Sequence, residues 1–251
     1  YTTGLEAMDY FLGDETLAPI GCESLFSEAI HRLNGPVFCY APPADAPEVS
    51  ALPALRNGYI TFGSLSRVIR MNDEVLATWA ELLRRVPNSR LRLDQPLFGD
   101  AASRAVFAEK LERLGLPMER VDLVASKPHW PSYHEIDITL DCWPHTIGTT
   151  AIESLYMGVP VLTKIDRPSV GRVAGVFNRA VGLEDWIVET RETYLETAIR
   201  ASGDLAALAD LRAGLRQRVL ASPLLDHAGF GRRFEQAMTA LLDRFETSRN
   251  G

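Results

Sequence analysis

The sequence predicts an α/β fold in which a parallel sheet is covered by helices on both faces. Between residues 58 and 163, short segments rich in β-branched and aromatic residues alternate with segments whose apolar residues recur at helical spacing. The connections between these segments are short. Strands that alternate with helices form parallel sheets, and right-handed crossovers then give a doubly wound, Rossmann-like layer.

Five segments of this region are expected to be strands. The clearest is Tyr59–Gly63, which is β-branched and aromatic and follows the turn signal Asn57-Gly58. The others are shorter but have the same apolar character. The expected strands cover residues 59–63, 90–93, 121–125, 136–140 and 159–163.

Helices are expected between these strands, over residues 73–86, 102–114 and 149–157. Gly115-Leu116-Pro117 ends the second of them, because glycine caps a helix and proline stops it. The last ~60 residues also follow the helical period. They carry two apolar stripes, Leu205, Leu208, Leu211, Leu215 and Val219, then Phe230, Phe234, Met238, Leu241 and Phe245.

Residues 1–57 differ from this pattern and are expected to be a partly irregular connector. Residues 41–47 read Ala-Pro-Pro-Ala-Asp-Ala-Pro, and Pro53 follows. Such a stretch fits neither a helix interior nor a central strand, so it reads as a linker. The chain begins at Tyr1 without an initiating Met, which suggests an excised or partial chain.

Composition and charge exclude several classes of function. The 251 residues carry a formal net charge of −7 and no basic run, so neither nucleic acid nor an anionic membrane is an expected partner. No apolar run approaches the ~20 residues of a membrane span, and no signal peptide opens the sequence. Cys22, Cys39 and Cys142 lack metal-ligand spacing and are interpreted as reduced, buried thiols of a cytoplasmic protein.

The turn that follows the strand at 136–140 is the most informative candidate for chemistry. Ligands of doubly wound sheets bind at the carboxyl ends of the strands. Here the helix at 149 opens with Thr149 and Thr150, with Glu153 one turn further on. One interpretation is an anion site at the helix N-terminus, with Glu153 gripping a ribose. The other is simple capping by threonine, with Glu153 completing a capping box from Thr150.

Three segments carry a resemblance to a known family. They are Tyr59–Arg67, Trp79–Ser89 and Gly148–Val161. Shorter matches are Gly171–Ala174, Val181–Leu183 and Ser222–Leu224. Together they resemble the O-linked N-acetylglucosamine transferases, including their bacterial relatives and the Spindly-type enzymes. The likeness runs from about residue 58 to the end, in the family's order.

The resemblance implies a GT-B fold, in which two Rossmann-like lobes face each other across a cleft. This chain resembles the C-terminal lobe. Residues 1–57 would connect it to a missing N-terminal lobe, 58–225 would bind the nucleotide sugar, and 226–251 would form a helix crossing to the missing lobe. The family's histidine-bearing catalytic segment and tetratricopeptide repeats are not in this sequence.

The resemblance also implies residues that hold the diphosphate. Thr149 and Thr150 should bind it, beside Gly148 in the turn. Arg70 matches a family lysine that neutralises the leaving group, so it is the catalytic candidate. The planar guanidinium of arginine here replaces the compact ammonium group of lysine. Arg67 matches a position that often donates to the nucleotide.

The nucleoside is expected to lie against a different loop. The stretch 124–130, Val-Ala-Ser-Lys-Pro-His-Trp, resembles the family loop that holds uridine. Lys127 would contact the ribose side, His129 would pack on the uracil and Glu153 would bind the ribose. The spacing from this loop to Asp141 is about one residue shorter than in the family, and a surface lysine and histidine remain the alternative interpretation.

The remaining candidates for catalytic or metal roles are two histidines, one cysteine and two aspartates. His134 is expected at the surface, and His145 is expected to line the cleft. Cys142 lacks a neighbouring base and is interpreted as a buried thiol. Asp137 and Asp141 lie on one face of a strand like a metal pair, but they are interpreted as structural.

The predicted function is the nucleotide-sugar-binding half of a protein O-glycosyltransferase. The whole protein would transfer a sugar such as N-acetylglucosamine from UDP to Ser or Thr, with no metal or cofactor. The acceptor protein would bind through the missing lobe, so this chain alone should be inactive. Two alternatives remain: a non-catalytic nucleotide-sugar-binding or regulatory module, and another GT-B enzyme such as a GDP-fucose-dependent transferase.

Overall fold

Six parallel strands form the centre of the computed structural model, which describes residues 2–250, with the backbone alone for 248–250. The order across the sheet is β5-β4-β3-β6-β7-β8. The strands are β3 Ile60–Ser64, β4 Ser89–Asp94, β5 Val121–Val124, β6 Ile138–Leu140, β7 Val161–Lys164 and β8 Ile187–Val188. The predicted doubly wound α/β fold is confirmed.

The strand order creates a switch point between β3 and β6. The chain runs outward from β3 to β5, returns to place β6 beside β3, and runs outward again to β8. The connections on the two sides therefore diverge and leave a crevice at the carboxyl ends of β3 and β6, where doubly wound sheets bind their ligands.

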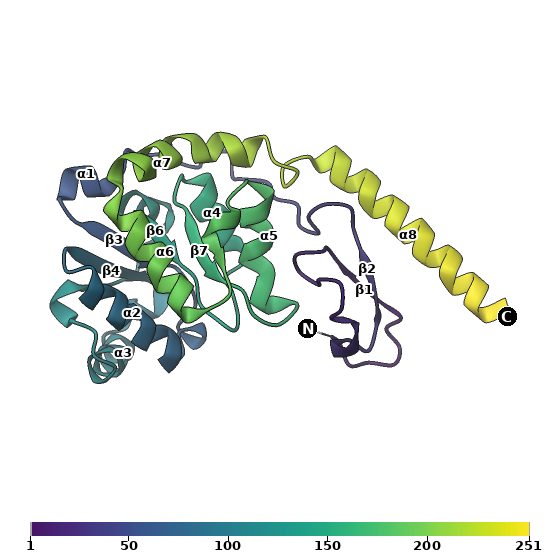
Figure 1. Ribbon diagram of the computed structural model, residues 1–251, viewed down its shortest axis with the longest axis horizontal. Helices are drawn as coiled ribbons and strands as arrows, with labels where there is room; N and C mark the ends of the chain where they lie inside the picture. The colour runs from purple at the N-terminus through teal and green to yellow at the C-terminus, as the bar shows by residue number, and fades with distance from the viewer. Residues whose placement is uncertain (1, 251) are drawn as a thin grey trace.

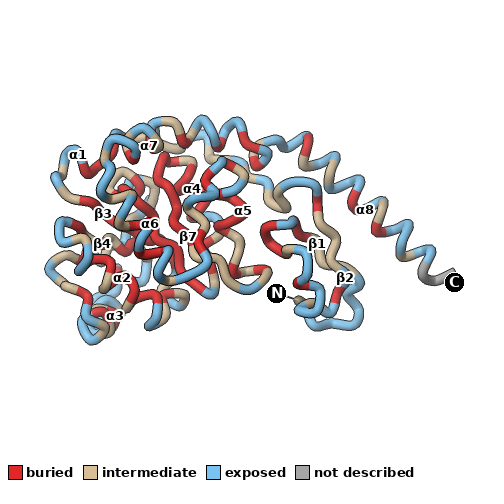
Figure 2. The backbone as a smooth tube through the Cα atoms, in the orientation of Figure 1, coloured by how far each residue is buried: buried red, intermediate tan, exposed pale blue. Residues whose placement is uncertain are grey.

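Helices cover both faces of the sheet (Figure 1). On one face lie α2 Asp73–Arg85, α3 Ala101–Arg113 and α6 Arg191–Gly203, which share a core cluster with the strands. On the other lie α4 Thr149–Tyr156, α5 Val173–Ala180 and α7 Leu205–Leu220. The buried segments concentrate between these layers (Figure 2). Trp79, Phe62 and Leu91 pack in the first cluster, and Ile152 and Leu215 in the second.

Short 3₁₀ helices fill many of the connections. One of them changes a predicted boundary, because the strand expected at 136–140 begins only at Ile138. The preceding residues 130–135 form a 3₁₀ helix, and Asp137 bonds its amide to the Thr61 carbonyl at 2.9 Å. The 3₁₀ helices are η1 Glu23–Leu25, η2 Val68–Arg70, η3 Pro96–Gly99, η4 Met118–Arg120, η5 Trp130–Glu135, η6 Val170–Arg172 and η7 Glu184–Trp186.

The N-terminal region contains more regular structure than the sequence predicted. β1 Tyr10–Gly13 and β2 Ala29–Arg32 pair in parallel as a separate two-stranded sheet, and α1 Pro53–Asn57 precedes β3. These short elements lie within residues 2–57, which are otherwise without helix or strand, apart from η1. The proline stretch at 42–47 has neither helix nor strand, as predicted.

The C-terminal helix α8 His227–Asn250 extends away from the sheet alongside β1 and β2 (Figure 1). Its predicted apolar stripe is only partly buried, because Phe234 and Met238 are exposed while Leu241 is covered. The first predicted stripe is packed against the body, with Leu215 and Val219 fully buried on α7. Within residues 2–250, none of the helices has the length and apolar character that crossing a membrane requires.

Candidate functional site

A cavity of about 570 Å³ lies at the carboxyl ends of the strands, beside the switch point. Residues that follow β3, β4, β5 and β6 all contribute to its wall. Five of the residues singled out from the sequence are among them. The lining consists of Leu65, Asp94, Gln95, Pro96, Ala125, Ser126, Lys127, Pro128, His129, Thr149, Thr150 and Glu153.

The N-terminus of α4 opens onto this cavity. Gly148 is the N-cap residue and provides no side-chain cap, while Thr149 is exposed and Thr150 half-buried in the first turn. The backbone N–H groups of such a first turn have no intrahelical acceptors and carry partial positive charge. The capping-box interpretation is wrong, because the helix begins two residues earlier than it requires and Glu153 bonds elsewhere.

Glu153 is held by two donors from the loop opposite. Nε2 of His129 lies 2.9 Å from Oε2 of Glu153, and the Tyr133 hydroxyl donates to the same oxygen at 3.0 Å. The Glu153 side chain lies in the cavity wall and is 12% exposed to solvent. Since both bonds end on Oε2, Oε1 is the oxygen that a ligand hydroxyl can use.

The loop after β5 is fixed by a residue that the sequence analysis missed. Asp94, at the end of β4, accepts a hydrogen bond from the Ser126 amide at 2.9 Å through Oδ1 and one from the Ser132 hydroxyl through Oδ2. Between these points, Lys127 is exposed and His129 stacks on Trp130 with ring centroids 5.2 Å apart. A buried Asp at a strand end was the available signal, since buried carboxylates need partners.

The two arginine candidates lie beside the cavity rather than in its wall. Arg70 ends η2 and donates from Nη1 to the carbonyl of Thr146 at 3.2 Å, on the turn that enters α4. Arg67 is exposed at the start of η2. Arg70 therefore brings a positive charge to the α4 entrance, and the cavity lining includes neither arginine nor Gly148.

The turn between β6 and α4 is anchored by Asp141. Its Oδ1 accepts from the amides of Cys142 and Ile147, each at 2.7 Å, and its Oδ2 from the Thr163 hydroxyl at 2.7 Å. Burial raises the pKa of Asp141 to about 7 despite these bonds. His145, in the same turn, is half-buried. Its pKa is lowered mainly by burial and further by the positive charge of Arg70.

The second acidic candidate serves a different segment. Asp137 accepts from the amides of Ala54 and Thr61, at 2.8 and 2.7 Å, and joins α1 to β3. Within residues 2–250, no group of His, Cys, Asp and Glu is arranged to hold a metal ion. The oxygens of Asp137 and Asp141 are instead occupied by backbone amides and the Thr163 hydroxyl.

The cysteines are unpaired, and their environments differ. Cys142 is fully buried, and burial raises its pKa to about 12, as expected for an inert thiol. Cys22 is also buried. Cys39 is exposed, so the expectation of three buried thiols is wrong for this residue, which lies in the irregular segment between β2 and α1.

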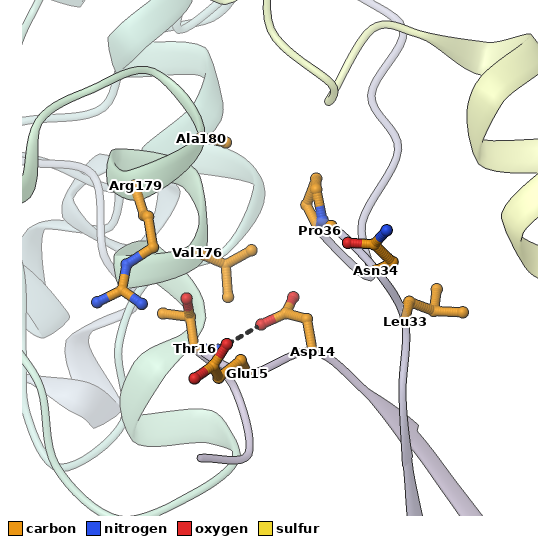
Figure 3. Close-up of a pocket in the computed structure, with 10 residues that line it drawn as sticks. Asp14, Glu15, Thr16, Leu33, Asn34, Pro36, Val176, Arg179 and Ala180 are labelled. Carbon is orange, nitrogen blue, oxygen red and sulfur yellow. Dashed lines mark hydrogen bonds between the residues drawn. The ribbon is translucent and has the colours of Figure 1, made fainter. Parts of the chain in front are cut away.

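A smaller cavity of about 250 Å³ lies between α5 and the N-terminal unit, the segment that contains β1 and β2 (Figure 3). Asp14 lies in its wall and accepts from the amides of Thr16 and Leu17, at 2.9 and 2.8 Å. Arg172 donates from Nε to the Thr16 carbonyl at 2.8 Å, which ties this unit to the start of α5. None of the eight predicted site residues lines it, so this cavity marks a junction between two parts of the chain.

The chain is similar to known glycosyltransferases over most of its length. The model of glycosyl transferase family 41 matches residues 50–234. A probable UDP-N-acetylglucosamine–peptide N-acetylglucosaminyltransferase SPINDLY of Petunia hybrida is 36% identical over 248 residues, which are 97% of this chain and 27% of that protein. The probable transferase SEC of Arabidopsis thaliana is 29% identical, over 90% of this chain and 24% of its own.

Solved structures show the same fold. A mutant O-GlcNAc transferase of Thermobaculum terrenum superposes with a TM-score of 0.85 and 32% identity, over 94% of this chain and 45% of that one. A sucrose-phosphate synthase of Thermosynechococcus elongatus shares the fold alone, with a TM-score of 0.58 and 16% identity. The chain thus spans about a quarter of the curated relatives' length.

Proposed function

Because this chain belongs to glycosyl transferase family 41 and has the fold of a GT-B lobe, we propose that it binds the donor nucleotide sugar of a protein O-glycosyltransferase. One observation carries the proposal. The cavity at the switch point is lined by Glu153, Lys127, His129 and the first turn of α4. A hydrogen-bond acceptor for a ribose, an aromatic ring for a nucleobase and an anion site therefore face the same cavity.

The donor we propose is UDP-N-acetylglucosamine. Two curated relatives that are 36% identical to this chain are named as probable transferases of that sugar from UDP to peptides. The arrangement supports a nucleoside diphosphate: Glu153 accepts from the ribose, His129 contacts the base, and Thr149 and Thr150 donate to the phosphates.

The chemistry that these residues can supply concerns the leaving group. When the sugar leaves, negative charge builds up on the diphosphate. The α4 N-terminus and the Arg70 guanidinium stabilise that charge without needing to reorganise. Proton removal from the acceptor hydroxyl is assigned in this proposal to a second lobe of the longer protein, as is binding of the acceptor protein.

The proposal also covers the organisation of the longer protein. Residues 1–57 connect to that second lobe, 58–225 bind the nucleotide sugar, and α8 crosses towards the second lobe. The exposed Phe234 and Met238 on α8 support this, because large apolar side chains are stabilised by a covering surface. The three unpaired cysteines support a cytoplasmic location.

Titration calorimetry tests the proposal directly. The 251-residue chain should bind UDP, should bind UDP more tightly than GDP or TDP, and should transfer no sugar to a peptide. No heat at millimolar UDP contradicts the proposal. Tighter binding of GDP would instead favour a different donor, and UDP binding without transfer by the longer protein would favour a non-catalytic module.

A further inference from the structure

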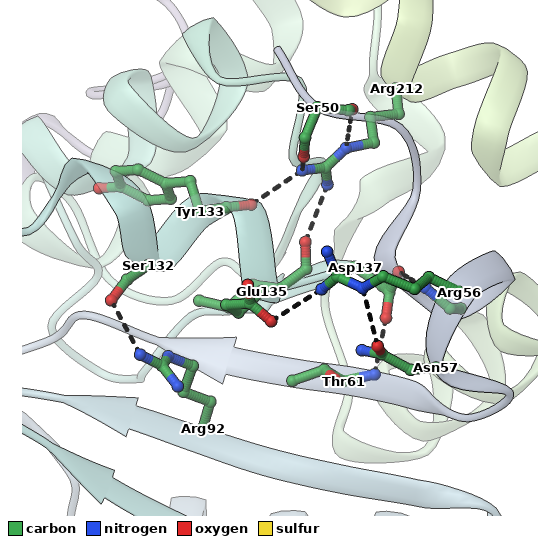
Figure 4. A network of polar contacts seen from close by, with 12 residues as sticks. Ser50, Arg56, Asn57, Thr61, Arg92, Ser132, Tyr133, Glu135, Asp137 and Arg212 are labelled. Atoms are coloured by element: carbon green, nitrogen blue, oxygen red, sulfur yellow. Dashed lines mark hydrogen bonds and ion pairs between the residues drawn. The ribbon is translucent and has the colours of Figure 1, made fainter. Parts of the chain in front are cut away.

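Arg212, on α7, is buried and reaches the linker before α1 and the segment formed by η5 and the residue that follows it (Figure 4). Its Nε donates to the carbonyl of Ser50 and its Nη1 to that of Ile136, each at 2.8 Å. Its Nη2 donates to the hydroxyl of Ser50 at 2.9 Å and to the carbonyl of Tyr133 at 2.8 Å. The rigid guanidinium therefore fixes the linker, η5 and the residue that follows η5 relative to one another.

The charge of Arg212 is balanced without a direct ion pair. Asp137 is the acidic neighbour that favours the charged form, but its oxygens are used by the amides of Ala54 and Thr61. Burial lowers the pKa of Arg212 to about 10, so the side chain stays protonated at neutral pH. A buried guanidinium held mainly by carbonyls is costly to replace, since each carbonyl would lose its donor.

Arg212 contacts both segments that position Glu153, the residue proposed to accept from the ribose. On one side it holds the Tyr133 carbonyl, and the Tyr133 hydroxyl donates to Glu153 at 3.0 Å. On the other side it lies against Gly158, just after the end of α4, the helix that carries Glu153. A Cβ added to Gly158 there would lie 2.8 Å from the carbonyl oxygen and 3.2 Å from Cγ of Arg212. Arg212 thus joins η5 to the segment after α4, behind the apolar cluster in which Tyr133 packs with Met157 and Val159.

We propose that Arg212 is a positioning residue for nucleotide binding: it holds η5 against α4, so that Tyr133 and His129 keep Glu153 in the orientation that accepts a ribose hydroxyl. This inference rests on the proposed function, because it concerns the same cavity. Arg212 does not line that cavity and acts through Tyr133.

A purely structural role would lower stability without changing which nucleotide is preferred. The informative quantity is therefore ribose selectivity, the ratio of the Kd of 2′,3′-dideoxyuridine diphosphate to that of UDP. A hydrogen bond from a hydroxyl to a carboxylate should give the wild type a ratio of about ten or more. Thermal unfolding measured alongside separates stability from selectivity.

The variants to compare are Arg212→Lys and Tyr133→Phe, with Arg216→Lys as the matched control. Arg216 lies one turn further along α7 and donates from Nε to the Tyr156 carbonyl at 2.8 Å, but it bonds to the linker and α4 rather than to η5. Tyr133→Phe removes the hydroxyl that donates to Glu153, so it tests the path even if the Arg212 variant fails to fold.

We expect Arg212→Lys and Tyr133→Phe each to weaken UDP binding about tenfold, to leave binding of the dideoxy analogue little changed, and so to bring the ratio close to one. Arg216→Lys should keep the wild-type ratio. UDP binding by the wild type with an unchanged ratio in Tyr133→Phe, or in a folded Arg212→Lys, overturns this inference alone. No UDP binding by the wild type overturns the proposed function as well.

Discussion

Nε2 of His129 lies 2.9 Å from Oε2 of Glu153, and this contact joins the loop after β5 to helix α4 across the mouth of the cavity. The two residues are 24 positions apart and follow different strands. Their contact exists because parallel strands end at the same edge of the sheet, on both sides of the switch point. It makes Glu153 the central residue for testing the site.

Glu153→Gln should weaken UDP binding about 10–100-fold, because a charged acceptor of a ribose hydroxyl becomes a neutral amide. Titration calorimetry measures the effect. Glu192→Gln, on the exposed start of α6, is the control and should bind as the wild type does. Wild-type affinity in Glu153→Gln would remove Glu153 from the proposed site.

Arg70→Ala should weaken binding of UDP but not that of uridine, because the proposed partner of the guanidinium is the diphosphate. The expected loss is about tenfold or more, and it should shrink as salt rises. Arg70→Lys should keep most of the affinity, since it retains the charge. Arg84→Ala, an exposed charge on α2, serves as the control, and equal losses for uridine and UDP would contradict the assignment.

Asp141→Asn should flatten the pH dependence of stability. Burial raises the pKa of Asp141 to about 7 from its ordinary 3.8, so folding favours the protonated carboxyl. Its contribution to stability is complete below about pH 4 and is lost as the pH rises to about 7. Urea unfolding between pH 4.5 and 8 should therefore show a fall in the wild type that is smaller in the variant.

The control for this experiment is Asp210→Asn, at an exposed position on α7. It should follow the wild-type pH profile. An Asp141→Asn profile parallel to that of the wild type would mean that Asp141 is already ionised throughout this range.

Asn72 has two separate roles that two variants can divide. Its Oδ1 caps α2 by accepting from the Val75 amide at 3.0 Å, and its Nδ2 donates to the Trp143 carbonyl at 2.6 Å. Asn72→Asp should keep the cap and lose the second bond, whereas Asn72→Ala loses both. We expect Asn72→Ala to cost about 1–3 kcal/mol in denaturant unfolding, more than Asn72→Asp. The reverse order would show that the cap contributes little.

Thiol titration should distinguish the cysteines in the native protein. Cys39 is exposed and should react with Ellman's reagent, whereas Cys142 is buried with its pKa raised to about 12 and should stay protected. Cys22 is buried and should also be slow. Cys39→Ser should abolish the fast reaction, and a fast reaction that survives would reveal opening of the core.

The fold was predictable from the sequence because its strands and helices differ in apolar period and are separated by short turns. Trp79 and Leu82 fall on one helical face and are both buried, as the period requires. The pairing of β1 with β2 was not predictable in this way. Each of those strands is only four residues long, and their pairing depends on contacts distant in sequence.

The candidate site was only partly predictable. A helix N-terminus leaves a local signal, and the family likeness supplied Lys127 and His129. Tyr133, Asp94 and Arg212 act through contacts between distant segments, which local patterns do not carry. Arg212 did leave one trace, because it lies four residues after Leu208 and three before Leu215, on the buried stripe of α7. A charge at such a position needs buried partners.

The double attachment of Asp94 has a consequence for the thermodynamics of binding. Because Ser126 and Ser132 are fastened to one carboxylate, the loop between them is already ordered before a nucleotide arrives. The entropy of ordering that loop is lost when the chain folds, so it does not count against the affinity. The loop is therefore preorganised for binding. The contacts that it makes with a nucleotide contribute to the binding free energy without an opposing cost for ordering the loop.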